Sequence, residues 1–401
     1  MVHVAILGFG TVGSGVAEVL ETNEERIRRN AATGFELKYI LDVRDFPGHP
    51  YASRFIKDFA IIEQDPDVRV VVETIGGTGV AYDFTKRCLL AGKDVVTSNK
   101  ELVATHGCEL LAIAKEKNLN YLFEASVGGG IPIIRPISQC LAANELDEIY
   151  GILNGTSNYV LTQMIANGLS LETAVKQAQD NGYAEADPTA DIEGHDAARK
   201  ICILASLSFG RHIYPDLVPT EGITNVTLED VSIAWNAGYK IKLLGRGLRV
   251  SNDKVSCYVA PHLIRKESLL GNVEDVNNAI VVRGNAIGSV MFYGAGAGKL
   301  PTASAVVADI IDCAKHFKAR KYIDWEEGGP SVFADPDTLK TRWYLRVPAG
   351  SGEVLETVSD AEVLDEKNGG TAFLTGEMDA KAARALAGKL SAASIFRLLE
   401  D

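Results

Sequence analysis

Short apolar runs alternate with amphipathic stretches in the N-terminal part of the chain. Residues Val2–Leu7 are nearly all apolar and lead into a glycine, and apolar positions with helical spacing follow in Thr11–Leu20. A short apolar run is typical of a strand buried on both faces of a parallel sheet, and the helix after it is typical of a crossover connection. The pattern therefore predicts that the chain opens with a parallel sheet.

The same alternation continues as far as residue 131. We expect further strands at Leu37–Val43, Val68–Ile75, Asp94–Thr97 and Tyr121–Phe123, and helices at Asp83–Ala91 and Leu102–Lys117. Repeated βαβ units predict an α/β fold in which residues 1–131 form a Rossmann domain.

From Pro132 the pattern changes. Helices are expected at Ser157–Gly168, Leu171–Gln179, Asp196–Phe209 and Leu228–Leu244, and strands at Glu148–Leu153, Val255–Val259 and Ala279–Tyr293. This mixture predicts a second, α+β domain over residues 132–300 with its own sheet. A helix within residues 301–320, starting at Ala303, is expected to complete the first domain, and residues 335–401 form a small α+β module.

Composition and charge narrow the class of partner. The 401 residues include 53 acids and 40 bases, a net charge of -13, which argues against binding of nucleic acid or anionic lipid and favours a small molecule. No apolar run approaches the ~18 residues of a membrane span, and the N-terminal residues lack a basic segment or cleavage site. The six cysteines are scattered, without the spacing of a metal or redox motif. We therefore expect a cytoplasmic protein with reduced, buried thiols.

A glycine-rich turn follows the first predicted strand. Gly8, Phe9, Gly10, Thr11, Val12 and Gly13 form the pattern Gly-x-Gly-x-x-Gly where a helix opens. Glycines there let backbone amides and the positive helix end approach a pyrophosphate. The context predicts a nicotinamide dinucleotide site, whereas a tight structural turn is the alternative.

The end of the second strand carries mixed signals about the cofactor. Asp42 and Arg44 lie on one strand face because side chains repeat every two residues. An acid there favours the ribose hydroxyl of NAD, and an arginine favours the 2′-phosphate of NADP. We favour NADP slightly, although Arg44 is also compatible with a plain surface position.

Residues 181–200 hold five acids and end in a lysine. Such density is compatible with a solvated acidic loop, or with a site for a cationic substrate or a proton carrier. Asp196 precedes Lys200 by four residues, so the two side chains should pair on one helical face.

Several separated motifs occur in the order found in homoserine dehydrogenases. They are Val71–Gly77, Thr97–Lys100, Phe123–Pro132, Gly151–Tyr159, Gly182–Pro188 and Gly294–Ser304. Over roughly residues 1–320 the chain resembles that family. The resemblance implies NAD(P)-dependent interconversion of L-homoserine and L-aspartate 4-semialdehyde, on the route to threonine, methionine and isoleucine, by a homodimer or a dimer of dimers.

Oxidising an alcohol by hydride transfer also moves a proton, so an acid/base must lie beside the nicotinamide. A lysine can serve if its pKa falls, which burial near a cationic ring would promote. The resemblance places both Lys100 and Lys200 in the active site. We assign proton transfer to Lys200 and polarisation of the oxygen to Lys100, with the reverse assignment still open. Asp196 would orient Lys200, because pairing raises a lysine pKa and so does not activate it.

The resemblance also implies the remaining ligands. Glu185 and Asp191 would bind the substrate, together with Lys100, whereas Asp187 shapes the loop and His195 is not catalytic. Cofactor contacts beyond the first loop, Asp42 and Arg44 would come from Thr74, Ser98, Lys100, Gly182, Gly296 and Gly298.

The segment from Glu124 to Pro132 resembles a monovalent-cation site, normally for Na⁺. Its ligands would be the Glu124 side chain and the carbonyls of Val127, Gly129 and Ile131. Hard oxygen ligands suit such a cation. A hinge loop without metal is the alternative.

The C-terminal residues depart from the family pattern. Many relatives end in an ACT regulatory module, and Thr341–Val347 supplies its first strand, but Ser351–Leu355 lacks the proline that should begin its helix. Thr371–Gly376, Asp379–Leu390 and Ser394–Leu399 are expected as strand, helix and strand. We interpret residues 335–401 as a truncated ACT-like module without effector binding; retained control by threonine is the alternative.

Two other functions stay open at the level of sequence. One is another Rossmann oxidoreductase acting on an amino acid or sugar. The other is a catalytically silent dinucleotide sensor, against which the intact set of Lys100, Asp196 and Lys200 argues.

Overall fold

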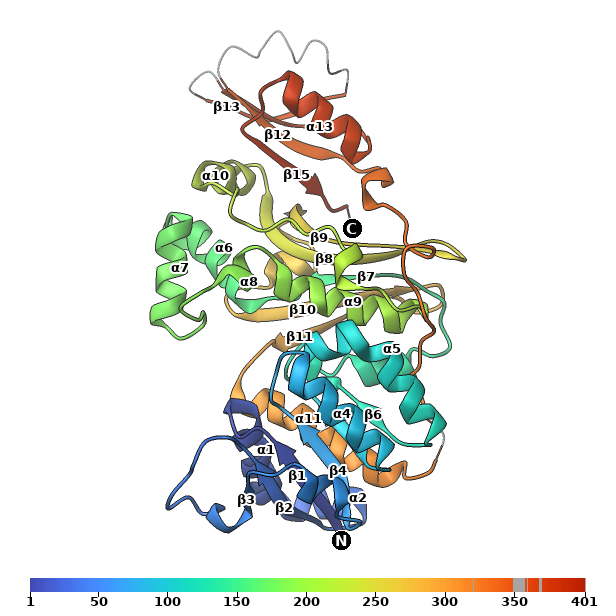
Figure 1. Ribbon diagram of the computed structural model, residues 1–401. Helices are drawn as coiled ribbons and strands as arrows, with labels where there is room; N and C mark the ends of the chain where they lie inside the picture. The colour runs from blue at the N-terminus through green and yellow to red at the C-terminus, as the bar shows by residue number, and fades with distance from the viewer. Residues whose placement is uncertain (320, 349–357, 359, 368–369, 401) are drawn as a thin grey trace.

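The computed structural model describes residues 1–319, 321–348, 358, 360–367 and 370–400. The elements form three successive parts along the molecule (Figure 1). The N-terminal parallel sheet lies at one end, a mixed sheet with its helices lies in the middle, and the C-terminal module lies at the other end.

The N-terminal part contains a parallel sheet of six strands in the order β3-β2-β1-β4-β5-β6. The strands are β1 (Val2–Leu7), β2 (Phe35–Leu41), β3 (Phe55–Ile56), β4 (Val68–Glu73), β5 (Asp94–Thr97) and β6 (Tyr121–Leu122). The apolar runs recognised in the sequence form its central strands, where Val4–Leu7 and Val70–Val72 are fully buried. The predicted Rossmann-like α/β class is confirmed.

Helices cover this sheet. They are α1 (Thr11–Thr22), α2 (Glu24–Ala31), α3 (Ala60–Gln64), α4 (Gly79–Leu90), α5 (Lys100–Glu116) and, from much later in the sequence, α11 (Lys299–Lys315). A Cβ on Gly15 of α1 would lie 3.0 Å from Cγ of Lys299, so the two helices approach closely. The expected returning helix is therefore present but begins four residues before Ala303 and ends at Lys315.

The middle part is built on a mixed sheet. Its strands are β7 (Leu146–Ile152), β8 (Tyr239–Ser251), β9 (Lys254–Arg265), β10 (Asn277–Gly284) and β11 (Gly288–Ala295), in the order β11-β10-β7-β8-β9. Its helices are α6 (Gly155–Asn167), α7 (Leu171–Asp180), α8 (Thr189–Ile192), α9 (His195–Phe209) and α10 (Leu228–Asn236). Helix α9 packs on this sheet, where Gly245 leaves room for Ile201, and it also contacts α5 of the first part.

The helix expected over Leu228–Leu244 is wrong in its second half. Helix α10 ends at Asn236, Gly238 adopts a φ of 89°, and β8 begins at Tyr239. Lys240 and Lys242, which fall in the expected helix, are instead buried on this strand and pair with Glu274. Long-range pairing of this kind overrides local helical preference.

The C-terminal module extends the same sheet. Its elements are β12 (Trp343–Val347), β13 (Glu362–Lys367), β14 (Gly370–Leu374), α13 (Ala380–Lys389) and β15 (Ser394–Leu398). Strand β15 pairs parallel to β9, which gives a nine-stranded sheet ending in the order β9-β15-β12-β14-β13. Strand β13 was not expected from the sequence, and the Ser351–Leu355 segment lies outside the described residues. The ACT-like classification stays a prediction.

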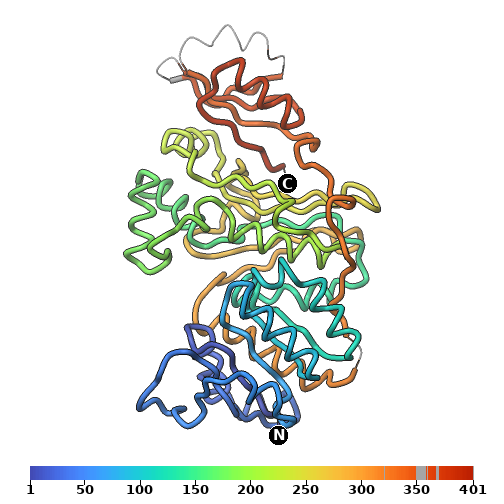
Figure 2. The backbone as a smooth tube through the Cα atoms, viewed as in Figure 1, coloured from blue at the N-terminus to red at the C-terminus, as the bar shows by residue number. Residues whose placement is uncertain are grey.

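Figure 2 shows the segment after α11 running along the side of the molecule from the first part to the C-terminal module. Short 3₁₀ turns occur at Ala52–Arg54, Glu124–Ser126, Pro215–Leu217, Leu270–Asn272 and Pro336–Thr338, and a π-helical turn at Pro136–Cys140.

The cysteines are unpaired, and not all are buried as expected, because Cys140 is exposed and Cys108 half-buried. Within the described ranges, no helix has both the length and the apolar character needed to cross a membrane.

Candidate active site

Two lysines from different parts of the molecule meet at one buried carboxylate. Nζ of Lys100, at the start of α5, lies 2.7 Å from Oδ1 of Asp196, and Nζ of Lys200 lies 2.7 Å from Oδ2 of the same side chain. Lys200 also donates to the carbonyl of Leu153 at 2.7 Å. Asp196 and Lys200 are four residues apart on α9, so the predicted pair on one helical face is present.

The loop before Lys100 is held by a buried acid at the end of β4. Glu73 accepts hydrogen bonds from the amide of Ile75 at 2.7 Å and from the hydroxyl of Thr97 at 2.6 Å. Asn99 then caps α5 by accepting from the amide of Leu102 at 3.1 Å. These bonds hold Lys100 at the carboxyl edge of the sheet, where open α/β sheets bind their ligands.

The electrostatics of the cluster differ between its members. Burial alone would raise the pKa of the Asp196 carboxyl, but the charges of Lys200 and Lys100 outweigh it and hold that pKa below its usual value. Burial lowers the pKa of Lys200, although the nearby Asp196 works in the opposite direction. The side chain of Lys200 is 11% exposed, whereas that of Lys100 is 38% exposed. Lys200 therefore has the environment that favours a neutral amine.

Asn154 connects two of the acids and was not predicted as a site residue. Its Nδ2 donates to Asp191 at 2.6 Å and to Asp196 at 2.9 Å, while its Oδ1 accepts from the amide of Ser157 and caps α6. Burial raises the pKa of Asp191. The available signal was an asparagine directly before a helix within the Gly151–Tyr159 motif.

The loop before α8 carries the other predicted substrate ligand. Glu185 is exposed there, and its carboxylate makes no hydrogen bond or ion pair with the residues described; only its carbonyl does, with Gln179. Asp187 accepts from the amide and hydroxyl of Thr189, so it shapes the loop as expected. Gly182 is exposed with a φ of 75°, and His195 is exposed at the first position of α9.

The predicted dinucleotide loop has room for a ligand at one glycine only. A Cβ on Gly13 would lie 2.0 Å from the carbonyl oxygen of Gly8, and one on Gly8 would lie 2.9 Å from that of Thr74. At Gly10, which precedes α1, a Cβ would meet nothing within 4 Å, and no side chain caps the helix. Gly8 and Gly13 therefore serve chain packing, whereas Gly10 leaves the helix amides open to an anion.

Asp42 already has protein partners in this structure. Its carboxylate accepts from the amide of Phe9 at 2.7 Å and from Nε and Nη2 of Arg44 at 3.0 and 2.9 Å. The Arg44 guanidinium holds the pKa of Asp42 below its usual value. The side chain of Arg44 is 58% exposed, so it is the more accessible of the two charges.

The glycines of the Gly294–Ser304 motif pack beside those of the Phe123–Pro132 segment. A Cβ on Gly129 would lie 2.5 Å from the carbonyl oxygen of Gly296, and one on Gly296 would collide with the Asn278 side chain. Gly298, with a φ of 126°, precedes α11. Ser98 is half-buried in the loop before Lys100.

Glu124, the side chain predicted to bind a cation, is buried and bonded to backbone amides. Its carboxylate accepts from the amides of Ile133, Ile134 and Arg135 at 2.6, 2.8 and 2.9 Å. In the part of the chain that the structure describes, no group of three or more His, Cys, Asp or Glu side chains is arranged to hold a metal ion. The side chain assigned to the cation is therefore already engaged with the backbone.

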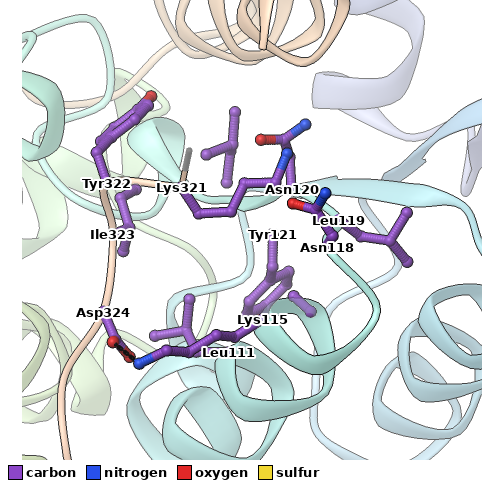
Figure 3. A pocket seen from close by; sticks show the side chains of 12 residues that line it. Leu111, Lys115, Asn118, Leu119, Asn120, Tyr121, Lys321, Tyr322, Ile323 and Asp324 are labelled. Atoms are coloured by element: carbon purple, nitrogen blue, oxygen red, sulfur yellow. Dashed lines mark hydrogen bonds and ion pairs between the residues drawn. The ribbon is translucent and has the colours of Figure 1, made fainter. Parts of the chain in front are cut away.

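A cavity of about 220 Å³ has none of the residues of this cluster in its lining, and Figure 3 shows the side chains that do line it. It is lined by the C-terminal end of α5, the start of β6 and residues 321–324, with the Lys115–Asp324 ion pair at its edge. Leu111 is the α5 residue of the lining nearest to Lys100 in sequence, so about 16 Å of helix separates the cavity from Lys100.

Known proteins share both the sequence and the fold. The family model for homoserine dehydrogenase matches residues 132–311, and the model for its NAD-binding domain matches residues 8–124. A homoserine dehydrogenase of Pseudomonas aeruginosa is 42% identical over 87% of this chain and 82% of its own length. The chain belongs to the homoserine dehydrogenase family.

Solved structures of the family agree. A homoserine dehydrogenase from Thiobacillus denitrificans superposes with a TM-score of 0.92 at 35% identity, over 100% of this chain and 98% of the other. A hyperthermophilic archaeal homoserine dehydrogenase in complex with NADPH gives a TM-score of 0.65 at 28% identity, over 79% and 98%.

Membership of the homoserine dehydrogenase family identifies the protein as an NAD(P)-dependent oxidoreductase acting on homoserine. The predicted activity is confirmed, and the two alternatives, another Rossmann oxidoreductase and a silent sensor, lose their support.

Proposed function

We propose that Lys200 carries the proton in homoserine oxidation, while Lys100 stabilises charge on the reacting oxygen. The observation that carries this proposal is the shared carboxylate of Asp196, 2.7 Å from both ammonium groups. One buried acid thereby orders two lysines from opposite sides of the site. Asp196 acts on them by position, since its own pKa lies below its usual value.

The reaction needs one base and one charge stabiliser. A bound nicotinamide supplies the two-electron acceptor, and the open amides at the start of α1 fit its pyrophosphate. Lys200 in its neutral form accepts the hydroxyl proton while the hydride leaves the carbinol carbon, so that the C–O bond becomes the aldehyde C=O. Lys100, as an ammonium, lowers the energy of negative charge developing on that oxygen. In the reverse direction protonated Lys200 returns the proton.

Substrate binding falls to the acids around α8. Asp191 is held beside the lysine cluster by Asn154, and its carboxylate can accept from the ammonium of homoserine. Glu185 can do so only if its exposed loop brings the carboxylate toward the site. We therefore give Asp191 the larger share of substrate binding.

The two lysine assignments are tested by Lys200→Met and Lys100→Met variants. Loss of the proton carrier should remove the rise of kcat with pH and cost about 10²–10⁴-fold in rate. Loss of the charge stabiliser should lower kcat while the pH dependence remains. If Lys100→Met is the variant that flattens the pH profile, the two roles are reversed.

For the cofactor we propose NADP. Asp42 is occupied by Phe9 and Arg44, whereas the Arg44 guanidinium is accessible to a 2′-phosphate. The archaeal relative solved with NADPH is consistent with this choice. Arg44→Ala should raise KM for NADP by about tenfold, the loss of one charge-assisted contact of about 1.4 kcal/mol, with little change for NAD. An equal change for both cofactors would contradict the proposal.

The cation proposal keeps all four predicted ligands. The carbonyls of Val127, Gly129 and Ile131 are candidates for Na⁺, and the Glu124 carboxylate, which accepts from three amides, has acceptor capacity left for a cation. We route no step of the reaction through a cation. Replacement of Na⁺ by K⁺ during thermal unfolding would reveal a bound ion as a shift in Tm.

The wider setting follows from the family. We propose that the enzyme serves threonine, methionine and isoleucine synthesis in the cytoplasm, as a homodimer or a dimer of dimers. The unpaired cysteines agree with a reducing compartment. Light scattering after size-exclusion chromatography would measure the mass; a value equal to one chain would exclude the oligomer.

A further inference from the structure

The C-terminal module is attached by charge to a loop of the middle part. Arg384 on α13 and Arg397 on β15 both pair with Oε1 of Glu221, at 3.3 and 3.2 Å. The guanidinium of Arg397 is buried over the rings of Tyr258 and Trp343, with centroids at 4.9 and 4.7 Å. Because aromatic contacts fix Arg397, the Glu221 carboxylate is tied to the position of the module.

The residues after Glu221 pack against the turn that follows Asp191. The amide of Ile223 donates to the carbonyl of Ile192 at 2.8 Å. Gly222 approaches so closely that a Cβ would lie 2.3 Å from that same carbonyl oxygen. No side chain fits between the two segments, so a shift of one moves the other.

The supported turn lies between the two site acids. Ile192 follows Asp191 directly, and Gly194, with a φ of 83°, precedes α9 two residues before Asp196. A Cβ on Gly194 would lie 3.1 Å from Cγ2 of Thr220, so the loop also contacts the far end of the turn. The turn that begins after Asp191 is therefore supported by the loop that carries Glu221.

We propose that Glu221 is a positioning residue through which the C-terminal module sets the place of Asp191, and thereby the affinity for homoserine. This deepens the proposed function, because it rests on the substrate-binding role given to this acid. Glu221 and Arg384 are about half-exposed, and such an ion pair adds little to overall stability. The effect of this ion pair is instead on the position of the loop that carries Glu221.

The test compares Glu221→Ala and Arg384→Ala with the unmodified full chain. Each variant should raise KM for homoserine roughly threefold to tenfold, the range common for mutations that couple distant sites, while kcat and the Kd for NADPH stay unchanged. Glu221→Gln keeps an acceptor for the arginines and should give a smaller rise. Glu109→Gln is the matched control: that carboxylate is 45% exposed, against 47% for Glu221, and pairs with Lys86 far from the turn.

Hydrogen exchange provides a readout that needs no turnover. The Ile223 amide, which bonds to Ile192, should exchange faster in Glu221→Ala than in the unmodified chain. An unchanged KM for homoserine overturns the proposal, and so does a fall in kcat and cofactor affinity together with KM, which would indicate general loosening. If the unmodified chain fails to oxidise homoserine, the proposed function fails and the exchange rate alone decides this inference.

Discussion

At the scale of single residues, the site depends on buried groups with more than one partner. Asp196 joins Lys100 to Lys200, and Asn154 joins Asp196 to Asp191. Removing one member leaves its buried neighbours with one partner fewer, which can cost more than the lost bond itself. Replacement of these residues should therefore change pH dependence as well as rate.

Asp196→Asn should shift the pH profile of homoserine oxidation toward acid. Burial lowers the pKa of Lys200 and Asp196 raises it, so removal of the carboxylate lowers that pKa further. Oxidation requires neutral Lys200, so activity rises as the pH passes its pKa. The ascending limb of kcat against pH should therefore move to lower pH. Asp187→Asn, which alters an exposed loop acid, is the control and should leave the limb in place. A shift toward alkaline pH would contradict this account of Lys200.

Some of these residues could be predicted from the sequence and others could not. The spacing of Asp196 and Lys200 on a helix is a local property, and the pair was expected. Asn154 acts across a distance of 42 residues to reach Asp196, and nothing in the local pattern specifies that contact. For Glu124 the ligand role stays a prediction, and its bonds to backbone amides 9–11 residues later were not predicted from the sequence.

At the scale of elements, the glycine loop between β1 and α1 separates packing from binding. Gly13→Ala should destabilise the fold by roughly 1–3 kcal/mol, because its Cβ would lie 2.0 Å from the carbonyl oxygen of Gly8. Gly10→Ala should leave the unfolding midpoint without cofactor nearly unchanged, since a Cβ there meets nothing. It should still weaken NADPH binding about tenfold, a loss of about 1.4 kcal/mol.

Urea unfolding and NADPH titration of both variants would test the distinction. Equal destabilisation by the two substitutions would show that Gly10 also serves packing.

The segment after α11 is held by a neutral histidine. Nδ1 of His212 accepts from Nε1 of Trp325 at 2.9 Å, so Nε2 donates to the carbonyl of Ala104 at 3.0 Å. Burial lowers the pKa of His212, so the unfolded chain binds a proton more readily than the folded one. This contribution to stability is complete above the ordinary histidine pKa of about 6.5 and is lost as the pH falls below it.

His212→Gln should therefore reduce the loss of stability on acidification. Urea unfolding at pH 7.5 and 5.5 gives the free energy of unfolding at each pH. The loss between the two should be smaller for this variant than for the unmodified chain, by up to roughly 1.4 kcal/mol per pH unit. His195→Gln, at an exposed position, should keep the original pH dependence. An identical pH dependence in all three proteins would count against the role of His212.

Elements with a local signal were predicted well. Strand β5 was expected at its observed bounds, and the start of α1 followed from the glycine loop. The first residues of β8 were expected to be helical, and this was wrong. The ion pairs of Lys240 and Lys242 with Glu274 form only in the folded sheet, so the local sequence does not indicate them. Its pairing with β9 and burial outweigh local preference.

At the scale of the whole molecule, one continuous sheet joins the middle part to the C-terminal module. The connection depends on two register pairs between β15 and β9, and on the buried Asp230 of α10, which accepts from Tyr344, Arg346 and Ser394 of the module. Residues so far apart in sequence leave no local pattern that predicts their pairing. The fold class could be predicted, whereas the fusion of the two sheets could not.

This arrangement places Lys100 and Lys200, from two parts of the molecule, at one carboxylate. The most direct test of the account follows absorbance at 340 nm with L-homoserine and NADP, comparing the unmodified enzyme with Lys200→Ala. We expect NADPH formation by the former and a loss of at least about 10²-fold in the latter, with NADPH binding intact. Comparable turnover by Lys200→Ala would contradict the central claim that the buried lysine cluster carries out the reaction.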